Sequence, residues 1–538
     1  MDTNPQAALF VGIDVGSASV RAGVFDASGN KLAFAVRPIL QANPRPFFYE
    51  QSTTDIWRQT AVAVREALAA SGRQASQVRG IGFDATCSLA VVGKGGKPVS
   101  VAEDGDPERD IIMWMDHRAT SEAADINATG DRALAYVGGE VSVEMELPKV
   151  LWLHRHQPER QAGVWRYFDL ADFMVWRASS SDVASVCTLT CKWNYLAHER
   201  QFSQNLLAAV GLSHLPEYVP PTVLPLGSAA GRLSEQAADE LGLPAGIAVA
   251  TGIIDAHAGG VALCGAQPQG SLAVISGTSC CHLVASREPV MVPGVWGPYF
   301  GAMLPGWWLN EGGQSAAGSL LDWTLRQSEA WPELQVQAKR EGRSVHAVAG
   351  DWVAALESRE GEPAASLHVL ADHYGNRSPR ADPDARGVIA GLALESGRDG
   401  LARLYLASVQ ALAYGTRHII ESMNAAGHRI ERLLITGGGA KNPLSLREHA
   451  DATGCDLQLA SEEDAVTLGS AVLAATACGA YADLQAAAGA MVHPARVLRA
   501  DPARRRFHDA KYRVYLSLYD DWQRCRILMA EAGPSATR

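Results

Sequence analysis

The sequence lacks the features that mark nucleic-acid-binding and membrane proteins. Its 538 residues contain no Lys/Arg-rich run, and 47 Lys and Arg against 58 Asp and Glu give a net charge of −11. Proteins that bind nucleic acid normally present a basic surface, so no nucleic-acid partner is expected. No window of 18 residues is free of charges and turn formers, and even the most apolar one, 247–264, contains Asp255, His257 and several glycines. The sequence therefore predicts no membrane-spanning helix and no membrane partner.

Cysteine is sparse, with nine residues and no Cys-x-x-Cys pair. This spacing argues against a zinc ribbon and against a thioredoxin-type redox pair, and it is typical of a reducing compartment. The first residues have neither the positive region nor the cleavage pattern of a secretory signal. We expect a cytoplasmic protein.

Two common catalytic motifs are also missing. The chain has no G-x-x-x-x-G-K-[ST] phosphate loop and no G-x-S-x-G nucleophile turn. Its composition, 47% hydrophobic and 20% charged, is that of an ordinary globular protein and excludes a disordered one. At about 150 residues per domain, the length allows three to four domains or two large α/β lobes.

Short apolar runs alternate with glycine turns and helical patterns. Strands are expected at 9–13, 20–26 and 78–84, with a helix at 54–70 between them. Strands at 248–251, 270–275 and 430–435 begin a similar pattern later in the chain. This order predicts an α/β fold in two lobes, each carrying a glycine turn. From about residue 501 the composition indicates a charged surface helix.

Three glycine-containing loops follow predicted strands: Asp14-Val15-Gly16-Ser17, Ser276-Gly277-Thr278-Ser279 and Gly437-Gly438-Gly439. Glycine lets backbone N–H groups approach an anion closely, and small hydroxyl side chains add donors. An acidic residue such as Asp14 would repel phosphate unless a divalent cation lay between them, and Mg²⁺ prefers such carboxylates together with phosphate oxygens. An ordinary hairpin turn is the alternative for the first loop.

Other polar residues are ambiguous from the sequence. Asp255 follows an apolar strand and is either a base facing a cleft or a helix N-cap. We interpret His257 as structural. Lys192, beside Trp193, is either part of a site or a surface lysine with a buried stem. Glu311 is able to bind a hydroxyl group or to cap a following helix.

Taken together and in order, six elements resemble the FGGY carbohydrate kinase family over about residues 8–490. They are 12–17, 114–118, 252–256, 277–279, 311–315 and 437–442. The resemblance implies an α/β protein of the actin-like ATPase superfamily, with two RNase H-like lobes that close over ATP and a sugar. On this basis we expect an N-terminal lobe at 1–254, a C-terminal lobe at 255–490 and a tail helix at 491–538.

The resemblance also implies the site. Asp255 falls on the family's catalytic aspartate, which accepts the proton of the sugar hydroxyl, and Asp14 and Asp255 would hold Mg²⁺. The residues expected at ATP are Asp14, Gly16, Ser17, Gly277, Thr278, Ser279, Gly437, Gly438, Gly439 and Asn442. The residues expected at the sugar are Ala85, Thr86, Lys192, Asp255 and Glu311.

Short motifs indicate the sugar. Residues 84–88, 191–193 and 311–314 are similar to the pentulose kinases, whereas the turns typical of xylulose and glycerol kinases are absent at 85–87. We expect phosphorylation of D-ribulose to D-ribulose 5-phosphate, with L-ribulose or ribitol as alternatives. A chaperone-like ATPase or an inactive sugar-sensing relative is a less favoured reading, and a homodimer is left open.

Overall fold

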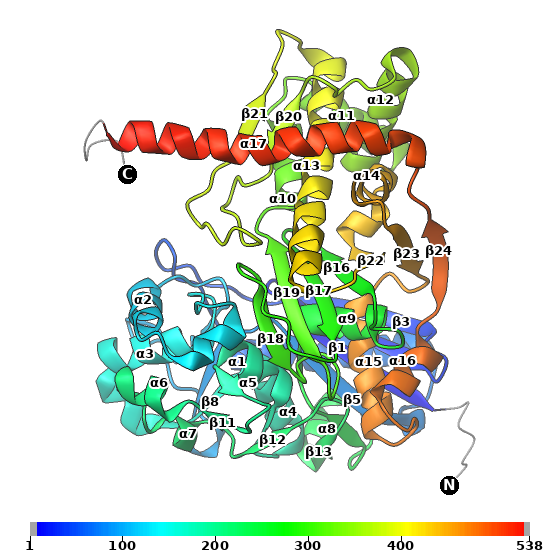
Figure 1. Cartoon of the computed structure of the whole chain (residues 1–538). Coiled ribbons are helices and arrows are strands. Elements are labelled where there is room, and N and C mark those ends of the chain that lie inside the picture. Colours follow the sequence, from blue (N-terminus) through cyan, green and yellow to red (C-terminus); the bar gives the residue numbers. More distant parts are fainter. Residues whose placement is uncertain (1–7, 532–538) are drawn as a thin grey trace.

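The computed structural model describes residues 8–531, and two large sheets organise it (Figure 1). The first sheet has the strand order β13-β14-β5-β1-β2-β3, and β15 pairs with the end of β5. Its strands are β1 (Leu9–Val15), β2 (Ser19–Asp26), β3 (Lys31–Pro38), β5 (Val78–Ala85), β13 (Ala229–Arg232), β14 (Ala248–Ala250) and β15 (Ile253–Ile254). β1 is antiparallel to β2 and parallel to β5.

The second sheet repeats this arrangement in the order β18-β19-β17-β16-β22-β23-β24. Its strands are β16 (Ser271–Ser276), β17 (Cys280–Ser286), β18 (Trp296–Phe300), β19 (Trp308–Gln314), β22 (Arg432–Gly437), β23 (Asp456–Ala460) and β24 (Pro494–Leu498). β16, β17 and β19 form an antiparallel meander, and β22 and β23 run parallel to β16, as β5 and β14 follow β1 in the first sheet. The expected pair of RNase H-like lobes is confirmed.

Helices cover both sheets and fill the connections. The longer ones are α1 (Thr53–Ser71), α3 (Glu146–His156), α4 (Leu170–Ser179), α9 (Asp255–Cys264), α11 (Trp331–Glu341), α12 (Val345–Glu360), α13 (Gly397–Ala426), α14 (Pro443–Thr453), α15 (Ala465–Ala477) and α17 (Arg505–Ala530). A smaller sheet, β4 (Glu50–Gln51), β7 (Ile111–Ile112), β6 (Leu89–Gly93) and β8 (Val164–Asp169), extends the N-terminal half. The helix expected at 54–70 is confirmed as α1, whose N-cap Ser52 accepts a hydrogen bond from the Asp55 amide.

Helices α9 and α15 join the two halves of the chain. α15 belongs to the C-terminal half of the sequence, yet it packs against β1 and β5 of the first sheet and against α9. α9 in turn packs against β16 of the second sheet. Glycines allow this close approach, since a Cβ atom at Gly12 would lie 2.0 Å from the Thr467 carbonyl oxygen. The two sheets are therefore held at a shared helical layer.

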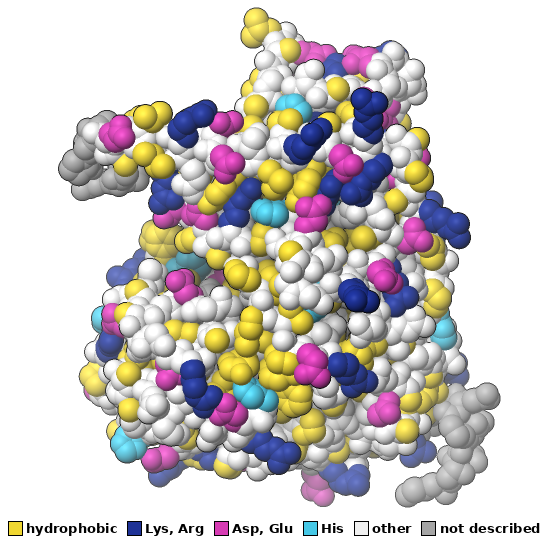
Figure 2. Space-filling model, in the orientation of Figure 1, with side chains coloured by type: hydrophobic (Ala, Val, Ile, Leu, Met, Phe, Trp, Pro, Cys, Tyr) yellow, Lys and Arg dark blue, Asp and Glu magenta, His cyan; other side chains and the backbone are white. Residues whose placement is uncertain are grey.

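The end of the described chain crosses the second lobe. After β24, α17 lies over that lobe and its last turns extend beyond the body of the molecule (Figure 1). The charged surface helix expected from about residue 501 is present as α17, and its inner face is buried at His508, Lys511, Tyr512, Tyr515 and Leu518. The wider tail helix expected at 491–538 is wrong at its start, because residues 494–498 form β24, and its last part, 532–538, lies outside the described residues. No helix within residues 8–531 is both long and apolar enough to cross a membrane. Figure 2 shows acidic and basic side chains interspersed over the visible face.

Candidate active site

Three carboxylates meet where neighbouring strands of the first sheet end. Asp14 on β1 lies opposite Asp84 on the parallel strand β5. β15 pairs with the last residues of β5, and Asp255 follows it as the first residue of α9. Asp14 and Asp84 are buried, whereas Asp255 is half-buried. The polar residues that end these strands thus form one acidic cluster at a common sheet edge.

The charges of this cluster are only partly compensated. Arg21 donates a hydrogen bond of 2.7 Å to Asp14 Oδ2, and Ser470 Oγ donates one of 2.6 Å to Asp84 Oδ2. Asp84 Oδ1 is buried and has no hydrogen-bond partner among residues 8–531. Burial raises the pKa of Asp14 and of Asp84. The negative charges of Asp14 and Asp255 raise the pKa of Asp84 further. Burial, followed by the charge of Asp14, raises the pKa of Asp255 to about 7. Such repulsion is relieved when a cation binds.

The first two glycine turns join the first strands of each sheet. Gly16 and Ser17 lie in the β1–β2 turn, where Ser17 Oγ accepts a hydrogen bond of 2.9 Å from Trp114 Nε1. Gly277, Thr278 and Ser279 form the equivalent β16–β17 turn, and Gly277 and Thr278 are exposed. The carbonyl oxygen of Thr278 accepts hydrogen bonds from the amides of Ala317 and Ser319. These contacts hold the second turn in place while its outer surface stays open.

The third glycine loop, at the end of β22, lies against the second turn. Gly437 pairs with Ser276 on β16, and a Cβ atom at Gly437 would lie 2.4 Å from the Ser276 carbonyl oxygen. A Cβ atom at Gly439 would lie 2.4 Å from Ser276 Oγ, whereas Gly438 meets nothing closer than 3.8 Å. Close packing on Ser276 therefore accounts for Gly437 and Gly439, and Gly438 keeps open space.

Asn442 follows this loop as the N-cap of α14. Its Oδ1 accepts hydrogen bonds from the amides of Leu444 and Ser445, and its Nδ2 donates one of 2.9 Å to the Tyr405 hydroxyl. The side chain thus positions the helix that follows the glycine loop. Its expected role at ATP remains a prediction.

The residues expected at the sugar are buried close to the acidic cluster. Ala85 ends β5, and the Thr86 amide donates a hydrogen bond of 3.0 Å to the Val15 carbonyl oxygen. Lys192 is 4% exposed, which is incompatible with the surface-lysine alternative. Glu311 is 5% exposed in the middle of β19, so the helix-cap alternative is wrong.

A histidine links Glu311 to the start of α9. His257 Nε2 lies 3.2 Å from Glu311 Oε2, and both side chains are buried. Burial disfavours the charge on Glu311, but the hydrogen bond and positive charge of His257, together with Lys192, lower the pKa of Glu311 to about 2. Glu311 is therefore ionised, and His257 fixes the orientation of its carboxylate.

The sequence analysis does not assign three residues that the structure places at the acidic cluster or beside Lys192: Asp84, Trp296 and Arg377. Asp84 was visible as a carboxylate that ends an apolar strand, as Asp14 does. Trp296 and Arg377 give no comparable signal, because contacts between distant segments place them beside Lys192 and Glu144. Two cations contact the Trp296 ring, with Lys192 Nζ 4.9 Å and Arg377 Cζ 5.2 Å from its centroid. Arg377 also reaches Glu144 of the N-terminal half, at 3.6 Å.

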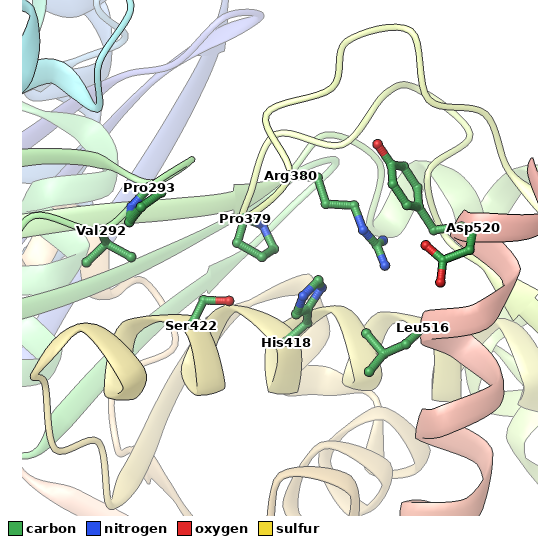
Figure 3. Close-up of a pocket in the computed structure, with 9 residues that line it drawn as sticks. Val292, Pro293, Pro379, Arg380, His418, Ser422, Leu516 and Asp520 are labelled. Atoms are coloured by element: carbon green, nitrogen blue, oxygen red, sulfur yellow. The ribbon is translucent and has the colours of Figure 1, made fainter. Parts of the chain in front are cut away.

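A separate cavity of about 520 Å³ lies away from these residues. It is lined by Pro379 and Arg380, by His418 and Ser422 of α13, and by Leu516 and Tyr519 of α17 (Figure 3). Arg380 stacks over the Tyr519 ring at 3.9 Å. None of the glycine turns or clustered carboxylates borders this cavity, so size alone does not make it the candidate active site.

The paired lobes, with the acidic cluster at an edge of the first sheet and glycine turns on both sheets, define a two-lobed protein of the actin-like ATPase fold. Models of the FGGY family of carbohydrate kinases match residues 9–262 with their N-terminal domain and residues 272–478 with their C-terminal domain. The chain belongs to the FGGY family of carbohydrate kinases, and the resemblance inferred from its motifs is confirmed.

Individual relatives agree with this assignment. An FGGY carbohydrate kinase domain-containing protein of Homo sapiens is 44% identical over 533 residues, covering 95% of this chain and 96% of its own length. A D-ribulokinase of Saccharomyces cerevisiae is 37% identical over 520 residues, covering 88% of this chain and 72% of its own. The crystal structure of a xylulose kinase from Rhodospirillum rubrum superposes with a TM-score of 0.80 at 23% identity, covering 96% and 99% of the two chains. That likeness shows the shared fold.

Proposed function

We propose that this sugar kinase transfers the γ-phosphoryl group of ATP to the terminal hydroxyl of D-ribulose. The proposal rests on the position of Asp255, which is half-buried, begins α9 and belongs to the acidic cluster. Two residues further along α9, His257 contacts Glu311, one of the two residues expected at the sugar. Phosphoryl transfer requires an oriented nucleophile and neutralised phosphate charge more than covalent chemistry. Sugar kinases of this family use ATP as the phosphate donor.

Asp255 acts as the general base in this proposal. A base works best when its pKa lies near the working pH, and burial together with Asp14 raises the pKa of Asp255 to about 7. The carboxylate takes the proton of the sugar hydroxyl as the hydroxyl oxygen attacks the γ-phosphorus, and the bond from the γ-phosphorus to the bridging oxygen breaks to release ADP. The Ala256 amide stabilises the Asp255 carboxylate by donating a hydrogen bond of 2.7 Å to Oδ1.

The acidic cluster fits a Mg²⁺ ion. Asp14 and Asp255 would hold the ion, and Asp84 adds a buried carboxylate oxygen that has no partner among the described residues. Mg²⁺ binds through one or two carboxylates, waters and phosphate oxygens. When bound, it neutralises charge on the phosphates. Gly16, Ser17, Gly277, Thr278, Ser279 and Gly437 to Gly439 supply the small residues and backbone donors for the nucleotide, next to Asn442.

Lys192 and Glu311 form the polar wall for the sugar, with Ala85 and Thr86 on the facing loop. The lysine donates to a hydroxyl or carbonyl oxygen, and the ionised carboxylate accepts from a hydroxyl. Both are buried, so a sugar that lacks a matching group leaves the Lys192 ammonium or an oxygen of the Glu311 carboxylate without a hydrogen bond to the ligand. Discrimination of this kind is strong.

The choice of D-ribulose rests on the relatives and on these short motifs. A D-ribulokinase and several ribulokinases are 30–37% identical to this chain over most of its length. The solved structures of the same fold include xylulose and gluconate kinases at 16–23% identity, which carry no argument about the substrate.

The test is ADP release measured with D-ribulose, L-ribulose, ribitol and D-xylulose, each against a control with ATP alone. We expect the highest kcat/KM with D-ribulose and little turnover without a sugar. A higher kcat/KM with any of the other three would overturn the assignment of D-ribulose. Turnover that does not depend on sugar would favour the chaperone-like ATPase instead.

A further inference from the structure

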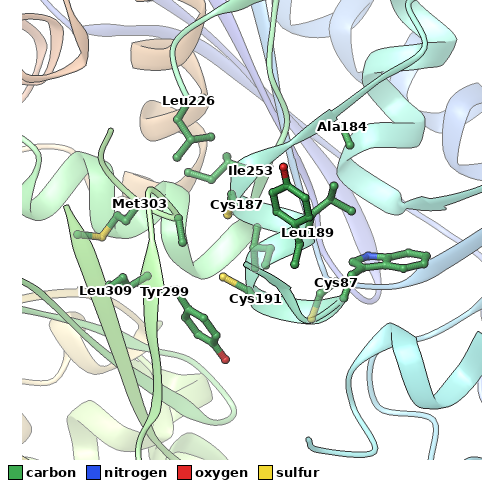
Figure 4. Packing of buried hydrophobic residues seen from close by; sticks show 14 of the residues in the cluster. Cys87, Ala184, Cys187, Leu189, Cys191, Leu226, Ile253, Tyr299, Met303 and Leu309 are labelled. Atoms are coloured by element: carbon green, nitrogen blue, oxygen red, sulfur yellow. The ribbon is translucent and has the colours of Figure 1, made fainter. Parts of the chain in front are cut away.

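Two cysteines and a histidine, side chains that commonly bind zinc, lie together next to the residues expected at the sugar. Cys187 and Cys191 belong to α5 (Val186–Lys192), and His257 belongs to the first turn of α9. His257 Nδ1 lies 3.1 Å from Cys187 Sγ and 3.9 Å from Cys191 Sγ, and the three atoms all lie within 4.8 Å of one another. All three residues are fully buried. Figure 4 shows the two cysteines on α5 among the surrounding apolar side chains.

These spacings are close to those in the ligand shell of a tetrahedral zinc ion. With Zn–S distances of about 2.3 Å and Zn–N distances of about 2.0 Å, neighbouring ligand atoms lie about 3.5–3.8 Å apart. The observed separations from His257 fall on either side of this range. Small side-chain rotations would therefore bring three ligands onto one ion.

A disulfide is a poorer explanation for the pair of cysteines. Residues four apart on a helix have Cβ atoms about 5–6 Å apart, whereas a disulfide requires about 3.8 Å. Oxidation would have to distort α5, which ends at Lys192. An ion between the two sulfur atoms needs no such distortion.

The second ring nitrogen of His257, Nε2, contacts a carboxylate, as it commonly does in histidines that bind metals. His257 Nε2 lies 3.2 Å from the Glu311 carboxylate, and Nδ1 faces the two sulfur atoms. Binding of the ion displaces the Nδ1 proton, and the imidazole then still donates from Nε2 to Glu311. Histidine ligands of metals usually donate their second N–H to a carboxylate, which fixes the tautomer and the ring orientation. Among proteins of reducing compartments, where the cysteine pattern leads us to expect this chain, clustered cysteine and histidine indicate a metal more often than a disulfide.

We propose that Cys187, Cys191 and His257 form a zinc site that ties α5 to α9, with the fourth position open to a water or another small ligand. The site is distinct from the acidic cluster, whose oxygen ligands suit Mg²⁺. It joins the helix that carries Lys192 to the helix that begins with Asp255. The inference does not depend on the identity of the sugar or on kinase activity.

The test uses full-length protein carrying Cys525→Ser, since Cys525 is an exposed thiol that would bind metals on its own. Because the cluster is buried, Zn²⁺ or Cd²⁺ is supplied both in the growth medium and to the purified protein. We expect about one tightly held ion per chain, an ultraviolet thiolate-to-Cd²⁺ absorption band, and a higher melting temperature with the ion bound. Zinc-edge X-ray absorption should show two sulfur and one or two nitrogen or oxygen neighbours.

Cys187→Ser and Cys191→Ser should each lose the absorption band and most of the bound ion. Cys264→Ser is the matched control, because Cys264 is buried on α9 outside the cluster and should leave binding unchanged. Glu311→Gln should weaken zinc affinity by about 10–100-fold. The proposal is wrong if the parent protein retains no ion under either loading condition. It is also wrong if X-ray absorption shows no sulfur neighbours, a result that does not depend on how the variants fold.

Discussion

At the scale of single residues, Asp255 is the side chain on which the proposed chemistry depends. Asp255→Asn keeps the size of the side chain but cannot accept the proton of the sugar hydroxyl. We expect kcat to fall by about 10²–10⁴ while ATP binding and the melting temperature stay near those of the parent. Asp239→Asn, at an exposed position, is the control and should retain full activity. A retained turnover above about a tenth of the parent value would remove Asp255 from this role.

Lys192 and Glu311 make a second residue-scale prediction. Lys192→Met and Glu311→Gln should each lower kcat/KM for D-ribulose by about 10- to 150-fold, the loss expected for a charged hydrogen bond of about 1.5–3 kcal/mol. The KM for ATP should change little. Lys94→Met, on the exposed surface, serves as the control. Unchanged sugar kinetics, or a parallel rise in both KM values, would show that this pocket is assigned wrongly.

The two halves of the site were not equally accessible to sequence reasoning. Asp14, the glycine turns and Asp255 each end a predicted strand, so their place at a sheet edge could be predicted from local pattern. The burial of Lys192 and Glu311 could not, because it depends on how α5 packs against the second sheet. The same holds for Trp296 and Arg377, which meet Lys192 and Glu144 only through contacts between distant segments.

At the scale of elements, the contact between α15 and the first sheet sets the layer between the lobes. A Cβ atom at Gly82 would lie 2.1 Å from the Ser470 carbonyl oxygen of α15. Gly82→Ala should therefore push α15 away from β5 and cost about 1–3 kcal/mol or more. We expect a lower melting temperature, measured by calorimetry.

Gly350→Ala is the control for this experiment. Gly350 lies within α12, and a Cβ atom there meets nothing within 4 Å. Replacing a helical glycine by alanine should raise stability by about 0.5–1 kcal/mol. If both variants lower the melting temperature to the same extent, close packing of α15 is not the reason for glycine at position 82.

Most elements followed from local sequence pattern, but their assembly did not. The strands expected at 9–13, 78–84 and 270–275 are present as β1, β5 and β16 within one or two residues of their predicted ends. The placement of α15 against β1 and β5 could not be predicted, because no local signal links residues 465–477 to the first sheet. The reason for glycine at positions 12 and 82, which is the close approach of α15, can be recognised only in the folded structure.

At the scale of the whole molecule, the proposed site lies between two lobes joined at α9 and α15. The ion pair between Arg377 and Glu144 connects the C-terminal half of the chain with the N-terminal half. ATP and sugar bound together should compact the protein more than either alone, as expected for hinge closure around a ligand. Small-angle scattering of the free, ATP-bound, sugar-bound and doubly bound protein measures this. Identical radii of gyration in the four states would contradict closure of the two lobes.

The central claim is that the chain moves a phosphoryl group from ATP to D-ribulose with Asp255 as the base. The most direct measurement is mass spectrometry of the sugar product after incubation with ATP labelled in the γ-phosphate, for the parent and for Asp255→Asn side by side. We expect labelled D-ribulose 5-phosphate from the parent and at most about a hundredth as much from the variant. Unlabelled sugar from the parent, or equal amounts of labelled product from both proteins, would contradict it.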